Sequence, residues 1–481
     1  MNRVTPWRFI VTFGLISLLG DVVYQGMRSI SGPLLRDLGA TAVTVGLVTG
    51  LGEAAALLFR LVSGPLADRS GHYWRWAMAG YGITALAVPL LGWSNAIWLA
   101  AGLIVIERFG KAVRSPAKDA LLAHATAATG RGKGFAVHKA LDQFGAVLGP
   151  LAVAGAMVIF AGRYGPSLTM LVLPGAAALA LLTYLRRVAP HPAAFELGMA
   201  TPPISRPPPT PTSPTDSPPA ASVDSAPSAQ TDPATPSSVP SAASDCALID
   251  PADRPPAASA DPAPSAQTDP PTSSPAPPTA TGSPSPITPH LPNRFWWFAT
   301  FAGVSLVGYS TFGLIAFHLV DRGLLATGLV PVLYAGAMAV DALVAVAMGV
   351  AYDRFGTKVL LALPVLCAIL PILAFAGSLP LVALGVLGWG AAMAIQESTL
   401  RAVIADVIPP ASRATAFGLF AAVTGTATAI GGALAGWLYQ TSIPALIAVT
   451  IIIQMIALTI LAFWLARGRH PYRLRRSSRP D

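Results

Sequence analysis

Acidic and basic residues occur inside long apolar segments of this 481-residue chain, where an ionisable group is costly. Asp21 lies near the middle of one such segment, and Asp341 lies at a similar depth in another. Neither has a cation within one helical turn of its own segment. A carboxylate in this position can bind a proton in one conformation and release it in another, if its neighbours change. We therefore predict proton-binding sites at Asp21 and Asp341.

Other charges in the apolar segments have opposite charges within helical reach. Glu53 and Arg60 are seven residues apart, and His138 and Asp142 are four residues apart with Lys139 between them. Such groups can form fixed ion pairs between helices, or they can carry protons. Both interpretations stay open, and the further proton-coupling candidates are Glu53, Asp142 and Arg108.

Polar and aromatic residues near these charges are candidates for the lining of a substrate cavity. Gln25 and Arg28 follow Asp21 at intervals of four and three, which places the three residues on one helical face. Tyr24 in the same segment and Gln396 in a later one complete the set.

The composition places these segments in a membrane. Hydrophobic residues make up 53% of the chain and charged residues only 11%, whereas a soluble protein carries roughly a quarter charged residues. Cys246 and Cys367 lie far apart in unlike segments, and the seven histidines form no pair at metal-ligand spacing, so we expect no resident metal and no cofactor. Nucleotide-binding and hydrolase motifs are missing from the sequence, so we expect no enzyme.

Apolar runs of near 20 residues, long enough to cross ~30 Å of hydrocarbon, recur on both sides of a central segment. They predict an all-α membrane protein with twelve transmembrane helices, six in residues 1–190 and six in residues 293–466, followed by a basic tail at 467–481. The expected spans are 8–33, 42–66, 74–94, 97–117, 135–159, 167–185, 295–319, 327–350, 359–377, 380–400, 415–439 and 444–466.

The central segment, residues 191–292, consists largely of Pro, Ala, Ser, Thr and Asp. The octapeptide at 226–233 occurs again at 263–270. With so few aliphatic residues the segment cannot offset its ordering entropy, so we predict a disordered linker. A spacer that grew by repeat expansion is favoured over a recognition segment.

Basic residues predict the orientation. The termini and every second connection hold 20 Lys and Arg residues, with Arg114 and Lys118 among them, whereas the other connections hold Arg36, Arg163 and Arg322. This asymmetry predicts a multi-pass protein of the cell (inner or plasma) membrane, with both termini and the linker in the cytoplasm. It also explains the net charge of +9 without a nucleic-acid partner.

The two halves repeat each other. The pattern G-x-x-x-D-R-x-G occurs at 64–71 and again at 349–356, an offset of 285 residues. Gly149 matches Gly431 at an offset of 282. Parallel six-span repeats are a transporter architecture, with the substrate site between the halves near the bilayer midplane.

These residues resemble the major facilitator superfamily. The segment from Gly64 to Arg75 is similar to the family's signature loop, which implies a latch that closes the cytoplasmic side in one state, with Arg75 as its cation. The residues of the implied latch are Gly64, Asp68, Arg69, Gly71 and Arg75, with Asp353 and Arg354 in the second half.

Three further segments carry the resemblance. Arg108 resembles the buried arginine of proton-coupled members, and Gly145-x-x-x-Gly149-Pro150 is similar to a motif of antiporters. Glycines four apart also allow two helices to pack closely, so this motif has two open interpretations. Residues 110–121 resemble a prokaryotic subgroup of mostly efflux carriers, some of them linked to nickel resistance.

Together these features predict a secondary active transporter that works by alternating access and exports a small drug-like molecule or metabolite in exchange for protons. The alternatives are a metal-cation (nickel-like) exporter, a proton-coupled uptake symporter, or a non-transporting scaffold or receptor. The expected partners are the substrate, protons and the lipid bilayer, and we expect a monomer.

Overall fold

The structure is a computed structural model that describes residues 4–127, 129, 131–192, 194–195, 291–408 and 412–467. Almost all of these residues lie in helices. The predicted disorder of the linker, and most of the predicted basic tail, fall outside the described residues.

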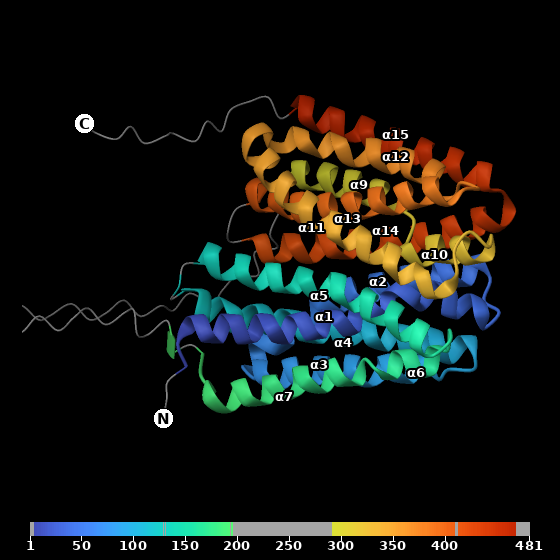
Figure 1. Cartoon of the computed structure of the whole chain (residues 1–481). Helices are drawn as coiled ribbons and strands as arrows, with labels where there is room; N and C mark the ends of the chain where they lie inside the picture. The colour runs from blue at the N-terminus through green and yellow to red at the C-terminus, as the bar shows by residue number, and fades with distance from the viewer. Residues whose placement is uncertain are drawn as a thin grey trace, which may run out of the picture. The chain divides into compact units, whose positions relative to one another are not determined.

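The first half of the chain forms one bundle of helices (Figure 1). Its last span is divided into a short helix and a longer one. The elements are α1 (Pro6–Asp37), α2 (Ala42–Ser70), α3 (Tyr73–Gly92), α4 (Ile97–Ala127), α5 (Arg131–Ile159), α6 (Tyr164–Thr169) and α7 (Val172–Val188).

The second half forms a matching bundle, whose first span is broken after Val307 and resumes at Phe312. Figure 1 shows this bundle, in yellow to red, beside the first one in blue to green. The elements are α9 (Asn293–Val307), α10 (Phe312–Asp321), η1 (Thr327–Leu329), α11 (Val330–Phe355), η2 (Gly356–Leu361), α12 (Ala362–Ala374), α13 (Leu379–Val407), α14 (Arg413–Thr441) and α15 (Ile443–Arg467).

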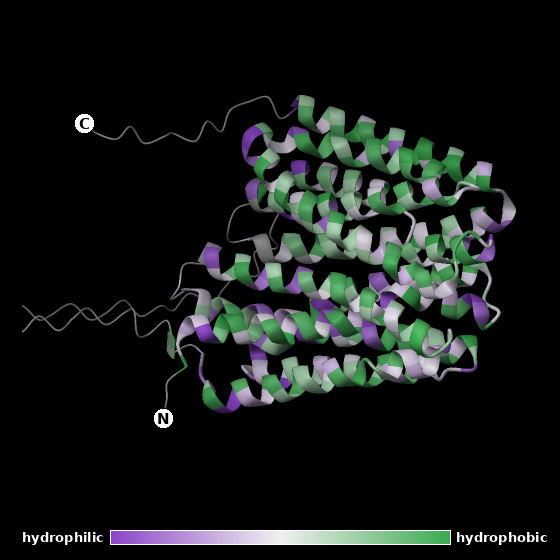
Figure 2. Ribbon diagram, viewed as in Figure 1, coloured by the Kyte–Doolittle hydropathy of each residue, from purple (hydrophilic) through white to green (hydrophobic). Residues whose placement is uncertain are grey.

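The outer surface suits a lipid bilayer. Nine helical stretches within the described ranges are long and apolar enough to cross a membrane, one of them spanning α11 to α12, and α3 and α4 add helices of 20 and 31 residues. Figure 2 shows apolar residues over most of the helices. Exposed tryptophans, which favour membrane–water interfaces, lie near both ends of the helices: Trp7, Trp296, Trp297, Trp93, Trp98 and Trp437.

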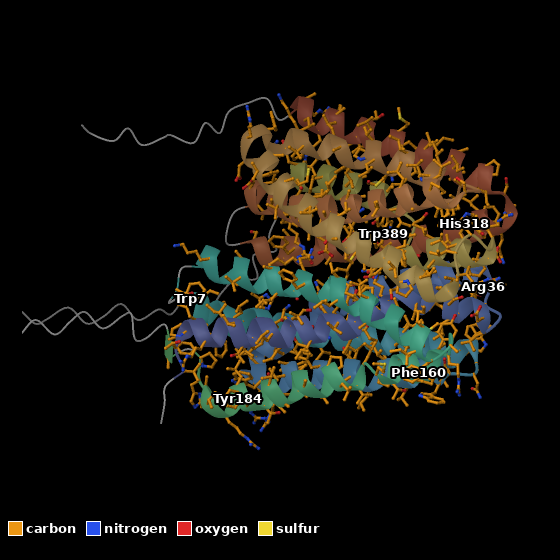
Figure 3. All side chains as sticks on the ribbon, in the orientation of Figure 1. Trp7, Arg36, Phe160, Tyr184, His318 and Trp389 are labelled. Atoms are coloured by element: carbon orange, nitrogen blue, oxygen red, sulfur yellow. The ribbon has the colours of Figure 1, made fainter. Side chains whose placement is uncertain are left out.

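We call the end where α1 begins and α15 ends the terminal end, and the opposite end the far end. Figure 3 marks the two ends of α1 by Trp7 and Arg36. Because consecutive spans alternate in direction, α2 runs from the far end to the terminal end, as do α4, α11 and α13.

The sequence repeat is a structural repeat. Helix α2 ends at Gly71 and helix α11 at Gly356, and both glycines have a positive φ, of 64° and 62°. A left-handed residue after the last turn ends a helix, and glycine takes this conformation without strain. The pattern at 64–71 and 349–356 therefore places a glycine of positive φ at the end of a helix in each half, with Asp68 and Asp353 in the last turn, while ψ differs, at 2° for Gly71 and −148° for Gly356.

Glycines bring helices together within each bundle. A Cβ at Gly145 would lie 2.9 Å from Cα of Leu18, and one at Gly149 would lie 2.8 Å from Cα of Val22, so α5 rests directly on the backbone of α1. In the second bundle a Cβ at Gly431 of α14 would lie 2.6 Å from the carbonyl oxygen of Val307. Such contacts supply van der Waals packing where lipid removes the hydrophobic drive between helices. The packing interpretation of the Gly145 motif is supported by this geometry.

Glycines also join the two bundles, through α2 with α14 and α1 with α10. A Cβ at Gly46 would strike the carbonyl oxygen of Gly432, and a Cβ at Gly32 would strike that of Gly313. These four residues lie toward the far end of their membrane spans, Gly313 at the start of α10 in the second part of its span. The halves are therefore in backbone contact there.

Candidate functional site between the bundles

An ion-pair group centred on Glu53 lies where the first bundle faces the second. The Glu53 carboxylate is 3.0 Å from Nη2 of Arg28 and 3.3 Å from Nη2 of Arg108, so α1, α2 and α4 each contribute one charge. Arg108 is only 4% exposed. An ion pair removed from water is stable when each charge has a close partner, and here one carboxylate serves two guanidinium groups.

The ring of Tyr24 lies beside two cations of α4. The guanidinium carbon of Arg108 is 4.6 Å from the ring centroid, and Nζ of Lys111 is 3.6 Å from it. Both are cation–π contacts, which strengthen when the groups are removed from water. Arg108 and Lys111, three residues apart on one side of α4, therefore both contact the same aromatic residue of α1.

The second bundle contributes aromatic residues to the same place. Trp389 of α13 lies 5.6 Å from the guanidinium of Arg28, measured to the ring centroid. Tyr334 of α11 donates a hydrogen bond of 2.7 Å to the side-chain oxygen of Gln25. Phe312 of α10 contacts both rings, at centroid distances of 4.4 Å from Tyr334 and 5.5 Å from Trp389. We call Tyr24, Arg28, Glu53, Arg108, Lys111 and Trp389 the inter-bundle site.

Trp389 is tied to the break between α9 and α10. Its indole N–H donates a hydrogen bond of 2.9 Å to the carbonyl of Ser310, and its own carbonyl accepts one of 3.0 Å from the hydroxyl of Tyr309. The rings of Tyr309 and Trp389 are stacked, with centroids 5.8 Å apart. A broken helix leaves backbone groups unpaired, and here α13 satisfies one of them.

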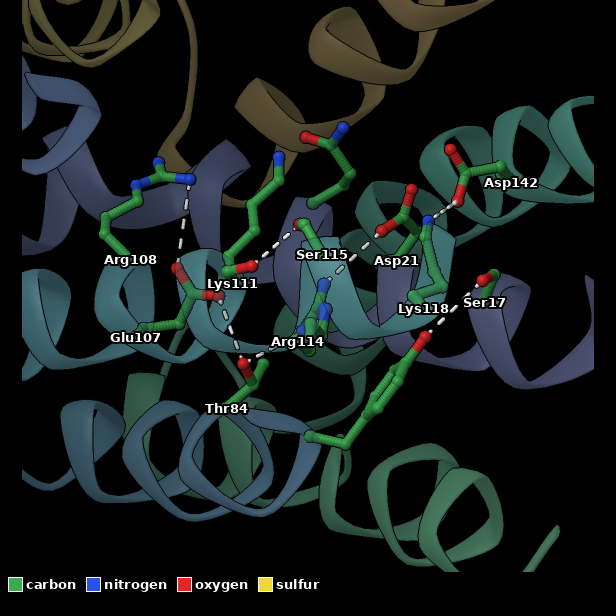
Figure 4. Close-up of polar contacts among 12 residues, drawn as sticks. Ser17, Asp21, Thr84, Glu107, Arg108, Lys111, Arg114, Ser115, Lys118 and Asp142 are labelled. Carbon is green, nitrogen blue, oxygen red and sulfur yellow. Dashed lines mark hydrogen bonds and ion pairs between the residues drawn. The ribbon is translucent and has the colours of Figure 1, made fainter. Parts of the chain in front are cut away.

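A second group of charges lies inside the first bundle, between α1, α4 and α5 (Figure 4). The Asp21 carboxylate is 3.7 Å from Nη2 of Arg114, and that of Asp142 is 3.8 Å from Nζ of Lys118 and 3.5 Å from Nζ of Lys139. The carboxyl groups of Asp21 and Asp142 are within electrostatic range of each other, and each has a cation of α4 beside it. Two carboxyl groups that interact in a low-dielectric environment are most stable when one of them holds a proton.

One turn toward the terminal end, this acidic pair is continued by neutral polar groups. Ser17 is 2.8 Å from Nε2 of His138 and 3.4 Å from the hydroxyl of Tyr81. Ser17 precedes Asp21 on α1, and His138 precedes Asp142 on α5, by four residues each. The side chains of Ser17, Tyr81 and His138 are buried. The polar groups thus form two stacked layers between the same helices.

Asp341 lies across the boundary between the bundles. Its carboxylate accepts a hydrogen bond of 2.6 Å from the side-chain amide of Gln143, the residue that follows Asp142 on α5. Adjacent residues of α5 therefore contact the acidic pair of the first bundle and the acidic residue of the second.

Toward the terminal end, charged side chains on the facing surfaces are in contact with solvent. Glu397 and Arg401 of α13 and Lys139 of α5 are exposed. Glu397 is nevertheless within electrostatic range of Lys139, Lys111 and Arg28, so it faces the first bundle rather than lipid. Solvent therefore reaches the facing surfaces of α5 and α13 toward the terminal end.

The far end is closed by polar contacts between the bundles as well as by glycines. Arg36 of α1 is 3.6 Å from Asp321 of α10, which also accepts a hydrogen bond of 3.3 Å from Tyr439. Nearer the site, the hydroxyl groups of Thr49 and Thr311 are 2.8 Å apart. A transporter with one end open and the other closed is in one of its two access states.

Comparison with known proteins shows the family. The model of the Major Facilitator Superfamily matches residues 13–340 and 323–481. The chain belongs to the major facilitator superfamily. Uncharacterized proteins of Mycobacterium tuberculosis and Mycobacterium bovis are each 45% identical over 95% of this chain and 93% of their own length.

Solved structures agree on the fold. A mutant form of the nucleoside transporter NupG has a TM-score of 0.62 at 12% identity, with 96% of this chain and 100% of that chain covered. A bacterial homologue of the human lysosomal transporter Spinster, in an inward-facing and occupied conformation, has a TM-score of 0.60 at 13% identity, with 96% and 97% covered. The predicted fold of this superfamily is confirmed, and the chain is a multi-pass membrane transporter rather than an enzyme.

The residues of the superfamily's signature loop lie at the terminal end. Asp68 accepts a hydrogen bond of 3.0 Å from the hydroxyl of Tyr73, and Arg69 and Arg75 are exposed. Asp353 and Arg354 are exposed too. Arg75 was expected to be the cation of the latch, but the group in contact with Asp68 is Tyr73. The latch role of the signature-loop residues stays a prediction, and it concerns the access state in which the terminal end is closed.

Several sequence expectations about charge pairing are corrected by the structure. Glu53 pairs with Arg28 and Arg108, whereas Arg60 donates a hydrogen bond of 3.2 Å to Ser115. Asp21 has no cation within one turn of its own helix, as the sequence indicates, but α4 supplies Arg114. Spacing along one helix indicates a shared face but not the partner on a neighbouring helix.

Arg114 and Lys118 were counted as residues of a connection, but they lie inside α4, which extends to Ala127. They were therefore missed as site residues, although a signal was present. Glu107, Lys111, Arg114 and Lys118 follow one another at intervals of four, three and four, which is one face of a helix.

The predicted cavity residues are distributed as follows. Tyr24, Gln25 and Arg28 lie at the inter-bundle site, and Asp21 lies behind it in the first bundle. Gln396 lies on α13 beside Glu397, and its amide nitrogen has no hydrogen-bond partner among the described residues. Within the same residues, no group of three or more His, Cys, Asp or Glu side chains could hold a metal ion.

Proposed function

We propose that this member of the major facilitator superfamily exports a small molecule in exchange for protons, with Asp21 and Asp142 as the proton-binding pair. The observation that carries the proposal is a largely buried cluster inside the first bundle, in which Arg114 lies 3.7 Å from Asp21 and Lys118 lies 3.8 Å from Asp142. Buried charges are costly in a membrane protein, and a cluster whose charge depends on one shared proton is suited to coupling.

The position of the pair next to the moving boundary supports coupling to conformation. Asp142 belongs to the acidic pair, and the next residue, Gln143, donates a hydrogen bond to Asp341 of the second bundle. When the bundles rock, the bond between Gln143 and Asp341 must change, and α5 transmits that change to Asp142. Protonation and conformation are then linked reciprocally, as any two coupled equilibria are.

The proposed cycle starts from the state that the structure describes. With the terminal end open, the pair loses its proton to the cytoplasm and the inter-bundle site takes up substrate. The bundles then rock, the contacts between Arg36 and Asp321 and between Thr49 and Thr311 break, and substrate leaves at the far end. A proton from that side rebinds the pair and favours the return. The cytoplasmic position of the terminal end rests on the basic residues of the sequence.

The direction of transport is the part of the proposal that rests on the resemblance. Gly145 and Gly149 are explained by packing against α1, so they carry no argument for antiport. The resemblance of residues 110–121 to efflux carriers favours export over uptake.

A labelling experiment tests the coupling without a known substrate. In a background with Cys246→Ala and Cys367→Ala, a single Thr311→Cys reports opening of the far end, because Thr311 is buried against Thr49. The labelling rate with a membrane-impermeant maleimide is measured between pH 5 and pH 9 in nanodiscs, with the reagent's own pH dependence determined on an exposed cysteine. We expect a pH-dependent rate in the parent.

The variants decide the result. Asp21→Asn and Asp142→Asn should each make the rate independent of pH, because an amide cannot titrate. Asp119→Asn, which removes an exposed carboxylate from α4, is the matched control and should keep the parent's profile. The proposal fails if both pair variants keep the parent's pH dependence.

A vesicle experiment tests the direction. In everted vesicles that hold a pH gradient, a substrate of a proton-coupled exporter dissipates the gradient when it is added outside. A panel of organic anions, organic cations and Ni²⁺ is screened, and responses are compared with those of Asp21→Asn vesicles. Accumulation of a panel compound in right-side-out vesicles down the proton gradient would instead identify a symporter.

A further inference from the structure

Polar atoms without a partner at the inter-bundle site are mainly donors. Among the described residues of the site, the atoms that are buried without a hydrogen bond are Nε and Nη1 of Arg108 and the hydroxyl of Tyr24. The acceptor in the same condition near them is Oε2 of Glu107, which is 3.8 Å from Nη1 of Arg108. Buried polar groups are normally paired, so unpaired ones at a binding site indicate what a ligand must bring. Here the ligand must bring acceptors.

The charges lead to the same conclusion. Arg28 and Arg108 share the carboxylate of Glu53, and Lys111 contacts the face of Tyr24 and has no carboxylate partner within the described ranges. Three cations therefore lie at the boundary with one carboxylate in direct ion-pair contact, Glu53, while Glu397 of the second bundle is within electrostatic range of Lys111 and Arg28. The second carboxylate of the region, Glu107, accepts its hydrogen bond from Thr84 of α3.

Figure 4 shows the Glu107 carboxylate between Thr84 and Arg108, with interactions to both. In Figure 4 the ends of Arg108 and Lys111 point away from Thr84, whereas Glu107 lies toward it. The surplus cations are thus on the side of α4 that carries the contacts to Tyr24 and Glu53.

Aromatic rings complete the site. Tyr24 of the first bundle and Trp389 of the second are both buried, with Phe312 and Tyr334 packed against Trp389. An apolar group that enters beside either ring when the bundles move would be held by stacking, and it would lie near the cations Arg28, Arg108 and Lys111, which contact these rings.

We propose that the inter-bundle site binds an organic anion, whose acidic group is held by Lys111 and the free N–H groups of Arg108, and whose ring or apolar part packs on Tyr24 and Trp389. Carboxylate, phosphate and sulfonate groups share the required chemistry, because each presents several acceptors and a negative charge. A metal or organic cation would instead need acceptors, and Glu53 is already shared by two arginines. That this ligand is the exported molecule rests on the proposed function; that the site binds it does not.

The test compares three probes of the same shape and different charge. Binding of 2-naphthoate, 2-naphthamide and 2-naphthylmethylammonium to the full chain is measured by calorimetry in phosphatidylcholine nanodiscs, in which no anionic lipid competes. We expect 2-naphthoate to bind about tenfold or more tightly than either of the others, as a charge-assisted contact replaces a neutral or repulsive one.

Variants locate the binding. Lys111→Gln should weaken 2-naphthoate binding about tenfold or more and leave 2-naphthamide binding unchanged, whereas Lys111→Arg should keep the preference for the anion. The matched control is Lys358→Gln, which removes the same charge from an exposed position of η2. It should bind 2-naphthoate as the parent does.

Three results would overturn the proposal. The first is that 2-naphthoate shows no binding, or binds no better than the amide or the ammonium compound. The second is that Lys111→Gln and Lys358→Gln have the same effect. The third is that a phosphatidylglycerol nanodisc abolishes 2-naphthoate binding in Lys358→Gln and the parent alike, which would mark the site as a lipid-headgroup site. The measurement needs no proton gradient, so it can fail while the pH-dependent labelling succeeds, and the reverse.

Discussion

Replacing Gly46 with alanine should open the far end. A Cβ at Gly46 of α2 would strike the carbonyl oxygen of Gly432 and lie 3.1 Å from the carbonyl carbon of Gly432 and 3.3 Å from Cα of Gly436. All these atoms belong to the backbone of α14, so no side chain can turn aside and the two helices must separate. Overpacking of this kind costs about 1–3 kcal/mol.

The cost falls on one access state. Alanine also favours the helix over glycine, but that gain is equal in both states and cancels in the equilibrium between them. A differential cost of about 1–3 kcal/mol shifts a two-state equilibrium about 5- to 150-fold. We therefore expect Gly46→Ala to raise the labelling rate of Thr311→Cys by a factor in that range at constant pH.

The matched control is Gly82→Ala on α3. No atom lies within 4 Å of a Cβ at Gly82, so the substitution is the same but meets open space. Size-exclusion profiles show first that both variants are folded. If Gly46→Ala labels Thr311→Cys no faster than Gly82→Ala does, then the glycine contact does not hold the far end closed, and the reasoning is refuted.

Three other changes have expected outcomes. Deletion of 202–286 should leave membrane insertion and transport intact, because a disordered spacer makes no packed contacts. The spacer interpretation would be wrong if the deletion abolished folding in detergent while point changes in the same segment did not. Asp68→Asn and Asp353→Asn should each lower turnover and raise labelling of cysteines at the terminal end, since the latch acts in the other state; unchanged labelling in both would argue against a latch. Asp321→Asn removes a partly exposed ion pair with Arg36, so it should raise the labelling rate of Thr311→Cys by about fivefold at most. A larger effect would mean that Asp321, rather than the glycine contacts, holds the far end closed.

The helices and the repeat could be predicted from the sequence because their signals are local. Hydropathy marks each span, and the glycine after Asp68 and Asp353 marks a helix end in each half. The break before Phe312 was not predicted, because the short polar stretch at 308–311 does not by itself end a span, and the interruption is stabilised by Trp389 from another helix. The length of α4 was underestimated, because Arg114 and Lys118 look like residues of a connection until their partners are known.

The candidate site could be predicted only in part. The types of its residues were correct, since Tyr24, Arg28 and Glu53 are too polar for lipid and must face protein or water. Their partners could not be predicted, because the pairing of Glu53 with Arg108 depends on how α2 and α4 cross. Contacts between the bundles are further removed from any local signal, since nothing near Gly46 indicates that Gly432 will meet it.

The two hydrogen bonds between Trp389 and the break after α9 make the aromatic wall of the site and the closure of the far end parts of one mechanical linkage. Tyr309 and Ser310 hold the ring and backbone of Trp389, and three residues later Gly313 rests on Gly32. A ligand that pushes the indole ring sideways must either break its bond to Ser310 or pull the start of α10 with it. The start of α10 thus couples the position of the Trp389 ring to the backbone contact that closes the far end.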